Sequence, residues 1–170
     1  MPSIITDKPR VELFRDLVRE GEERAREPLD ETLESYLVFT LVEHLRDPVL
    51  AAEPMALSLL DGLEQVGGVR EQRLRAVGDR CLLIAGFFPD LARRRLVTPG
   101  YYAALGRHAY DELAAAMRAS LAELYQALSE AFDALVHVLS ACRALPAARP
   151  LSLSVVADRD SRQPPRTRRH

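Results

Sequence analysis

Glycine-based turn signals are scarce in this sequence. Its 170 residues include only 8 glycines, and the Asn-Gly and Asp-Gly pairs that mark tight β-hairpins are nearly absent. Alanine, leucine, glutamate and arginine dominate instead, and these residues favour helices. With 48% hydrophobic and 28% charged residues, the chain has the composition of a globular domain, which excludes disorder of the whole chain. We therefore predict an all-α fold, a single helical bundle.

Cysteines and long apolar runs are also few. The two cysteines, Cys81 and Cys142, lie within apolar helical patterns and show no CxxC spacing. No apolar run approaches the roughly 18 to 20 residues that cross a bilayer, and residues 1–10 lack the pattern of a signal peptide. We expect reduced core thiols in a soluble, cytoplasmic protein that has no membrane contact.

Lysine occurs only at Lys8, so arginine supplies the positive charge. The net charge of −2 hides an uneven distribution: residues 146–170 carry about +4, which leaves about −6 on residues 1–145. The basic tail contains no aromatic residue that stacks on bases. We therefore expect no nucleic-acid binding by the acidic body. Nucleic-acid binding by the tail is the weakest of the functions considered.

Apolar spacing, together with start and stop signals, predicts about six helices. The clearest start signal is Thr98 followed by Pro99, a hydroxyl N-cap before proline at the first helical position. Residues 1–145 form the predicted bundle, and residues 146–170 form a Pro/Arg-rich tail predicted to be flexible. Residues 36–42 are apolar nearly all round, so the helix at 31–47 is expected to be central. The expected helices span residues 9–26, 31–47, 54–66, 69–88, 99–117 and 120–145.

Catalytic motifs are missing as well. The sequence contains no nucleophile elbow, phosphate-binding glycine loop or HExxH pattern, so we assign no catalytic residue and no cofactor. His108 and Glu112 are four residues apart, a spacing that allows two helical side chains to share a metal ion. His44, beside Glu43, supplies a third ligand only if its helix meets the helix at 99–117. We assign no metal site and expect a local His108–Glu112 contact.

Aromatic residues gather around the start of the helix at 99–117. Tyr101 and Tyr102 lie there, shortly after Phe87 and Phe88, and these rings serve either as core residues or as the lining of a small-molecule pocket. Gly106 is expected to permit a close helix crossing. The candidate pocket residues are His44, Phe87, Tyr101, Tyr102, His108 and Glu112.

Arg93, Arg94 and Arg95 form the densest charge cluster of the predicted bundle. They precede the start of a helix, where backbone amides also attract anions, so they are candidates for an anion site. Three adjacent residues point in different directions, however, and a solvated cluster that pairs with acidic groups is the favoured interpretation.

Three segments resemble a group of bacterial all-helical proteins: residues 34–45, residues 77–90 with a GD...GFFP pattern, and residues 100–110 with a YY...LG..AY pattern. The resemblance covers about residues 30–115 and implies no known activity, cofactor or catalytic residue. The positions that carry it are Gly78, Asp79, Phe88, Pro89, Tyr101, Tyr102, Gly106 and Tyr110.

The longest apolar seam lies between residues 120 and 145, at alternating steps of four and three. A flank formed by Leu124, Ala131, Val138 and Leu145 widens it beyond what one neighbouring helix covers. We therefore predict a non-enzymatic protein-interaction or regulatory module that acts as a homodimer or binds another protein. The alternative is a small-molecule- or metal-binding bundle, as an enzyme or otherwise, with its pocket between the helices at 31–47 and 99–117.

Overall fold

The computed structural model describes residues 3–44 and 53–149, so the predicted flexible tail lies outside the described residues from residue 150 onward. Within these residues the fold is all-helical, and no strand occurs. The bundle therefore has the predicted class, with eight α-helices described where about six were expected. The helices are α1 (Ser3–Ala25), α2 (Glu31–His44), α3 (Met55–Glu64), α4 (Gly67–Gly86), α5 (Pro89–Arg94), α6 (Pro99–Ala116), α7 (Ala119–Glu130) and α8 (Phe132–Arg143), followed by a 3-10 turn at Pro146–Ala148.

The central helix is α4, and the expectation that the helix at 31–47 is central is wrong. α4 packs against α6, α3 and α8 and also contacts α2 and α5. Its second half, residues 77–86, is buried at every position except Arg80. α2 has one open side, since Phe39 is 55% exposed. The apolar character of α2 on all sides therefore did not make it the central helix. α4 is central although its exposed first half carries charged residues.

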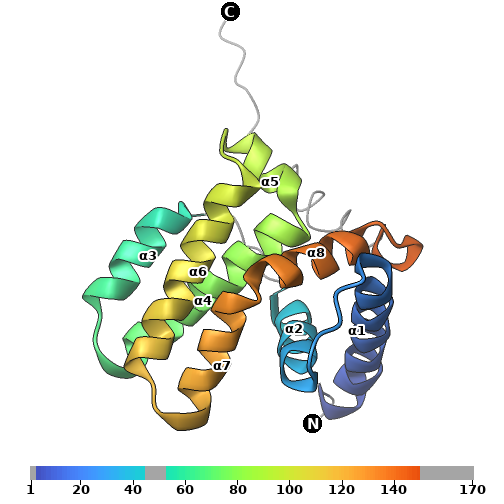
Figure 1. The fold of residues 1–170 in the computed structure, drawn as a ribbon, viewed down its shortest axis with the longest axis horizontal. Helices are drawn as coiled ribbons and strands as arrows, with labels where there is room; N and C mark the ends of the chain where they lie inside the picture. Colours follow the sequence, from blue (N-terminus) through green and yellow to red (C-terminus); the bar gives the residue numbers. More distant parts are fainter. Residues whose placement is uncertain (1–2, 45–52, 150–170) are drawn as a thin grey trace, which may run out of the picture.

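The other helices surround α4 in two groups. α1 and α2 lie on one side of the molecule, α3 lies on the other, and α6 runs beside α4 between them (Figure 1). α8 packs against both α1 and α4, while α7 packs against α6. This arrangement brings α2, α4 and α6, which are far apart in the sequence, around one region of the core.

Two glycines allow α4 and α6 to approach closely. A Cβ at Gly78 of α4 would lie 2.4 Å from Cε1 of Tyr110 on α6. A Cβ at Gly106 of α6 would lie 2.5 Å from Cζ of Phe132 and 3.0 Å from the Cβ of Cys81 on α4. A side chain at either position would lie too close to these carbon atoms, so the close crossing predicted at Gly106 is confirmed.

Local start signals also behave as predicted. Thr98 has extended backbone angles, and its hydroxyl accepts a hydrogen bond from the backbone N–H of Tyr101 at 3.3 Å, while Pro99 opens α6. Asp30 does the same for α2, because its Oδ1 accepts the N–H of Leu33 at 2.8 Å. These caps satisfy backbone donors that have no partner within the helix.

The single helix expected at 120–145 is two helices. The chain leaves the helix at Ala131, where φ is −88° and ψ is 8°, so α7 ends and α8 begins in a new direction. No glycine or proline occurs at this point. The bend lets α7 follow α6 while α8 turns towards α1 and α4, which places Phe132 and Leu135 in the core. A second additional helix, α5, begins at Pro89, in the segment between the helices expected at 69–88 and 99–117.

Most of the seam between residues 120 and 145 is buried within one chain, although Leu121 at its start is 50% exposed. Leu128, Leu139 and Cys142 are fully buried, as are Val138 and Leu145 of the flank, and the remaining flank residues pack partly against the core. Most of the apolar surface that motivated the homodimer is therefore covered by the molecule's own helices.

The cysteines match their prediction, because both Cys81 and Cys142 are buried free thiols. Burial raises the pKa of the Cys142 thiol to about 12, and its Sγ donates a hydrogen bond to the carbonyl oxygen of Leu17. Among the described helices, none combines the length and the apolar character that a bilayer span requires.

Candidate metal centre

Asp79 is a carboxylate in the middle of the apolar half of α4. It is only 1% exposed, and it lies between Val77 and Cys81, which are also buried. Removing a charge from water costs several kcal/mol, so a buried carboxylate needs strong hydrogen bonds or an opposite charge. The structure provides both kinds of partner, and they reach Asp79 from opposite sides.

One oxygen of Asp79 is held by two tyrosines. Its Oδ1 accepts hydrogen bonds from the hydroxyls of Tyr36 on α2, at 2.6 Å, and Tyr110 on α6, at 2.8 Å. Burial raises the pKa of both tyrosines, and the negative charge of Asp79 raises it further, so both hydroxyls keep their protons and donate. The missing side chain at Gly78 makes room for the Tyr110 ring. Asp79 is thus fixed in orientation by α2 and α6 together.

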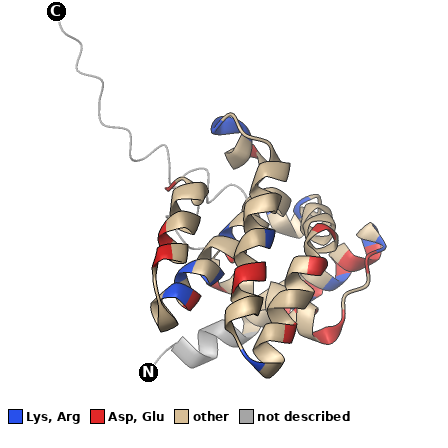
Figure 2. Ribbon diagram, turned by 60° about the vertical axis from the view of Figure 1, so that its left-hand side comes forward, with Lys and Arg blue, Asp and Glu red and all other residues tan. Residues whose placement is uncertain are grey.

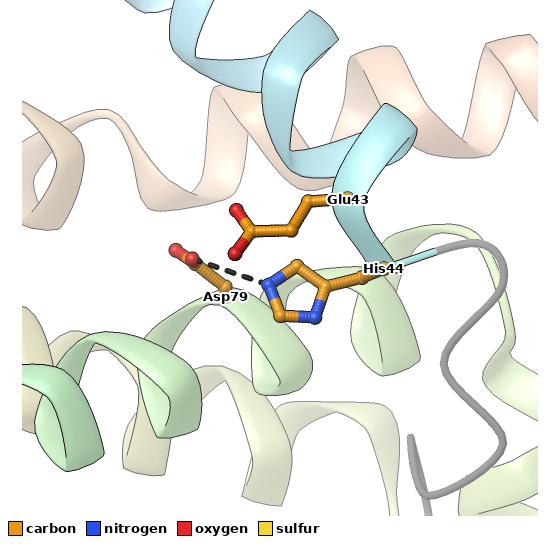
Figure 3. A group of neighbouring side chains, drawn as sticks. All are labelled: Glu43, His44 and Asp79. Carbon is orange, nitrogen blue, oxygen red and sulfur yellow. Dashed lines mark ion pairs between the residues drawn. The ribbon is translucent and has the colours of Figure 1, made fainter. Parts of the chain in front are cut away.

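The other oxygen of Asp79 faces two nitrogen groups. Nε2 of His44, a buried residue at the end of α2, lies 3.5 Å from Oδ2, and Nε of Arg75 lies 3.7 Å from the same atom. Both distances are longer than a good hydrogen bond. Figure 3 shows the imidazole of His44 directed at the Asp79 carboxylate.

Glu43 completes the cluster. It precedes His44 on α2, and its carboxylate turns towards Asp79 (Figure 3). One ligand atom each of Glu43, His44 and Asp79 lies within 4.8 Å of the other two, and no other such trio of His, Cys, Asp or Glu occurs among the described residues. Oε2 of Glu43 also accepts a bond from Nη2 of Arg75 at 3.1 Å.

This donor set suits a divalent transition-metal ion. An imidazole nitrogen and two carboxylate oxygens are ligands of Zn²⁺, and they also suit Mn²⁺ and Fe²⁺. Two donors that share a tetrahedral ion at about 2.1 Å lie roughly 3.4 Å apart, close to the 3.5 Å between His44 Nε2 and Asp79 Oδ2. Glu43 is exposed and has a carboxylate oxygen within 4.8 Å of the other two ligand atoms.

The guanidinium of Arg75 contacts both carboxylates of this cluster. Burial lowers the pKa of its guanidinium, but the negative charges around it, including Asp79 and Glu43, outweigh that effect and leave the pKa above its ordinary value. With a neutral imidazole, two carboxylates and one guanidinium leave one negative charge in excess. Such an excess of negative charge would favour a bound cation beside Arg75.

The residues proposed from sequence as a pocket are dispersed. Phe87 and Tyr102 are buried in the core, and Tyr101 is 43% exposed. His108 and Glu112 lie 3.8 Å apart on the surface of α6, as expected for a local pair, and Glu112 also pairs with Arg70 at 3.0 Å. Of the six candidates, only His44 belongs to the cluster around Asp79.

Arg93, Arg94 and Arg95 lie at the end of α5, where Figure 2 shows basic residues at the tip of the helix. Arg93 pairs with Asp90, one turn earlier, at 2.9 Å between Nη1 and Oδ1. Asp90 also forms an ion pair with Arg143 of α8, at 3.0 Å between Oδ2 and Nη2. At Arg93, the favoured interpretation of a cluster paired with acidic groups thus agrees with the observed contacts.

A cavity of about 380 Å³ lies between α3 and α4, away from all the candidates named from sequence. Its lining includes Leu57, Ser58 and Asp61 from α3 and Val77 and Arg80 from α4. Asp61 forms an ion pair with Arg73, and Ser58 donates to Glu53 at 3.1 Å. Several of its polar groups are therefore already satisfied within the protein.

Sequence reasoning missed Asp79 as a site residue, along with Tyr36 and Arg75. A usable signal was present, because a lone carboxylate on the buried half of a helix is rarely tolerated without partners. Arg75 lies four residues before Asp79 on the same helix, a spacing that the sequence shows. The tyrosine partners were not readable, since they belong to helices 43 and 31 positions away along the chain.

Comparison with known proteins finds no matching family model, no matching curated protein and no matching solved structure. The resemblance drawn from the segments around Tyr36, Asp79 and Tyr110 therefore stays a prediction.

Proposed function

We propose that this protein is a metal-binding helical bundle in which Glu43, His44 and Asp79 bind one divalent transition-metal ion. One observation carries the proposal: Asp79 uses Oδ1 for two tyrosine hydroxyls and presents Oδ2 to His44. Metal-binding carboxylates are commonly oriented in this way by hydrogen bonds from outside the coordination sphere.

Three protein ligands leave coordination positions for water or a small molecule. Structural zinc sites use four protein ligands, whereas catalytic sites use three and keep an open position. Glu43 is exposed at one edge of the cluster, so the open positions face solvent. The proposal therefore refines the metal- or small-molecule-binding alternative and moves its site from Tyr101 and His108 to Asp79.

The test is metal binding by purified, metal-free protein. We expect titration calorimetry with Zn²⁺ and Mn²⁺ to give one site per chain, and Co²⁺ to produce a visible absorption band. His44→Gln removes the imidazole ligand and should weaken binding at least about tenfold. His108→Gln is the matched control, because His108 is an exposed histidine outside the cluster. Absence of binding, or equal affinities for both variants, would overturn the proposal.

A second candidate is self-association, the function predicted first from sequence. Most of the helix seam that suggested it is buried, whereas Leu57 and Leu60 of α3 are 62% and 57% exposed. They lie three residues apart and so share one face of the helix. This face of α3, not residues 120–145, is the surface that supports a homodimer.

A further inference from the structure

We infer that the metal ion and Arg75 together bind an oxyanion, a phosphate or carboxylate group. This inference rests on the metal-binding function proposed above and adds the class of ligand that occupies the open coordination positions.

Arg75 is well placed to change partners. It contacts Glu43 at 3.1 Å and Asp79 at 3.7 Å, and its side chain is 48% exposed. The Glu43 side chain is exposed to a similar degree. Ion pairs between exposed side chains contribute about 0 to 1 kcal/mol, so the Arg75–Glu43 pair is weak enough to break when a divalent ion binds Glu43.

The charge balance then reverses. Glu43, Asp79 and Arg75 carry a net charge of −1 with a neutral His44, and a divalent ion changes this to +1. Glu43 Oε2 and Asp79 Oδ2 both face Arg75, so an ion bound through these carboxylates would compete with the guanidinium for them. A guanidinium that loses its carboxylates beside a divalent cation needs an anion between the two charges.

The distances allow one anion to contact both the metal ion and the guanidinium of Arg75. An ion about 2.1 Å from Asp79 Oδ2 lies no more than about 6 Å from Nε of Arg75, which is 3.7 Å from that oxygen. An oxyanion spans this gap by placing one oxygen on the metal and another on the guanidinium. Arginine suits this role because its planar N–H groups match the spacing of carboxylate and phosphate oxygens.

The experiment uses the full chain loaded with Co²⁺, whose absorption band reports changes in coordination. We expect inorganic phosphate or acetate to shift the band and to bind at a 1:1 ratio, with no binding to the metal-free protein. The two anions distinguish a phosphate ligand from a carboxylate ligand. Arg75→Gln should weaken anion binding at least about tenfold while metal affinity stays equal or rises, because a positive charge has been removed.

Arg73→Gln is the matched control, since Arg73 lies on the same helix in an exposed pair with Asp61. It should leave anion binding unchanged. Metal binding without any response to phosphate or acetate overturns this inference alone, as does equal anion binding by the Arg75→Gln variant. Failure of the wild-type chain to bind metal overturns the proposed function and this inference together.

Discussion

Asp79 is the residue on which the most contacts depend. A charged side chain that is 1% exposed persists in the core because two hydroxyls and two nitrogen groups surround it. Hydrogen bonds to charged groups contribute about 1.5 to 3 kcal/mol each, more than bonds between neutral groups. The residue thus links α2, α4 and α6 at one point.

We expect Asp79→Asn to lower the free energy of unfolding by about 2 kcal/mol, because it replaces charged hydrogen bonds by neutral ones at nearly constant volume. Urea unfolding followed by circular dichroism measures the change. Asp133→Asn serves as the control, since Asp133 pairs with Arg107 on the surface; it should change stability by less than about 0.5 kcal/mol. Equal effects of the two substitutions would contradict a structural role for Asp79.

The buried tyrosines predict a loss of stability at alkaline pH. Burial and Asp79 raise the pKa of Tyr110 well above 10.0, so above pH 10 the unfolded chain releases a proton that the folded chain retains. The folded state then binds more protons, and its stability falls as pH rises. At pH 7 the folded and unfolded states both keep this proton, so the ionisation of Tyr110 does not make stability depend on pH there.

Tyr110→Phe should therefore make this alkaline decline shallower, by up to about 1.4 kcal/mol per pH unit above pH 10. The same variant should lose about 1.5 to 3 kcal/mol of stability at neutral pH, because it lacks the hydrogen bond to the Asp79 carboxylate. Urea unfolding of both proteins at pH 8, 10 and 11 separates the two effects. Parallel curves for the two proteins would show that Tyr110 does not keep its proton.

At the scale of the elements, the contact between α4 and α6 depends on small residues. Gly106 meets Phe132 and Cys81 at distances that leave no room for a methyl group. We expect Gly106→Ala to destabilise the fold by about 1 to 3 kcal/mol through overpacking. Gly68→Ala, at the start of α4, is the control, because nothing lies within 4 Å of its added Cβ. Thermal unfolding of both variants compares them, and an unchanged Gly106→Ala protein would show that the crossing can widen freely.

Boundaries of elements were predictable where a local signal marks them, as Thr98 and Pro99 mark the start of α6. Gly67, which has a φ of 59°, marks the break between α3 and α4, but α4 begins at Gly67 and not at residue 69 as expected. The end of α7 at Ala131 carries no such signal. The break lets α8 pack against α1 and α4 while α7 packs against α6, so tertiary packing overrides local propensity at this point.

At the scale of the whole molecule, the oligomeric state follows from what the bundle leaves exposed. If the α3 face mediates self-association, light scattering coupled to gel filtration should give twice the chain mass of 19.0 kDa. The double substitution Leu57→Glu and Leu60→Glu should return the protein to 19.0 kDa, because charges on this face would be buried without partners. Leu121→Glu, at a half-exposed leucine of α7, is the control. A mass of 19.0 kDa for the wild-type chain at all concentrations would exclude the homodimer.

The sequence by itself determined the all-α class, most helix positions, the capped start of α6, the close crossing at Gly106 and the buried free thiols. Each of these depends on residues within a few turns of one another or on composition, where spacing and propensity act directly. Only the tertiary structure decided which helix is central, where the chain bends at Ala131, and that Glu43, His44 and Asp79 converge. Such contacts depend on how three helices cross, and periodicity within one helix carries no information about the atoms of another.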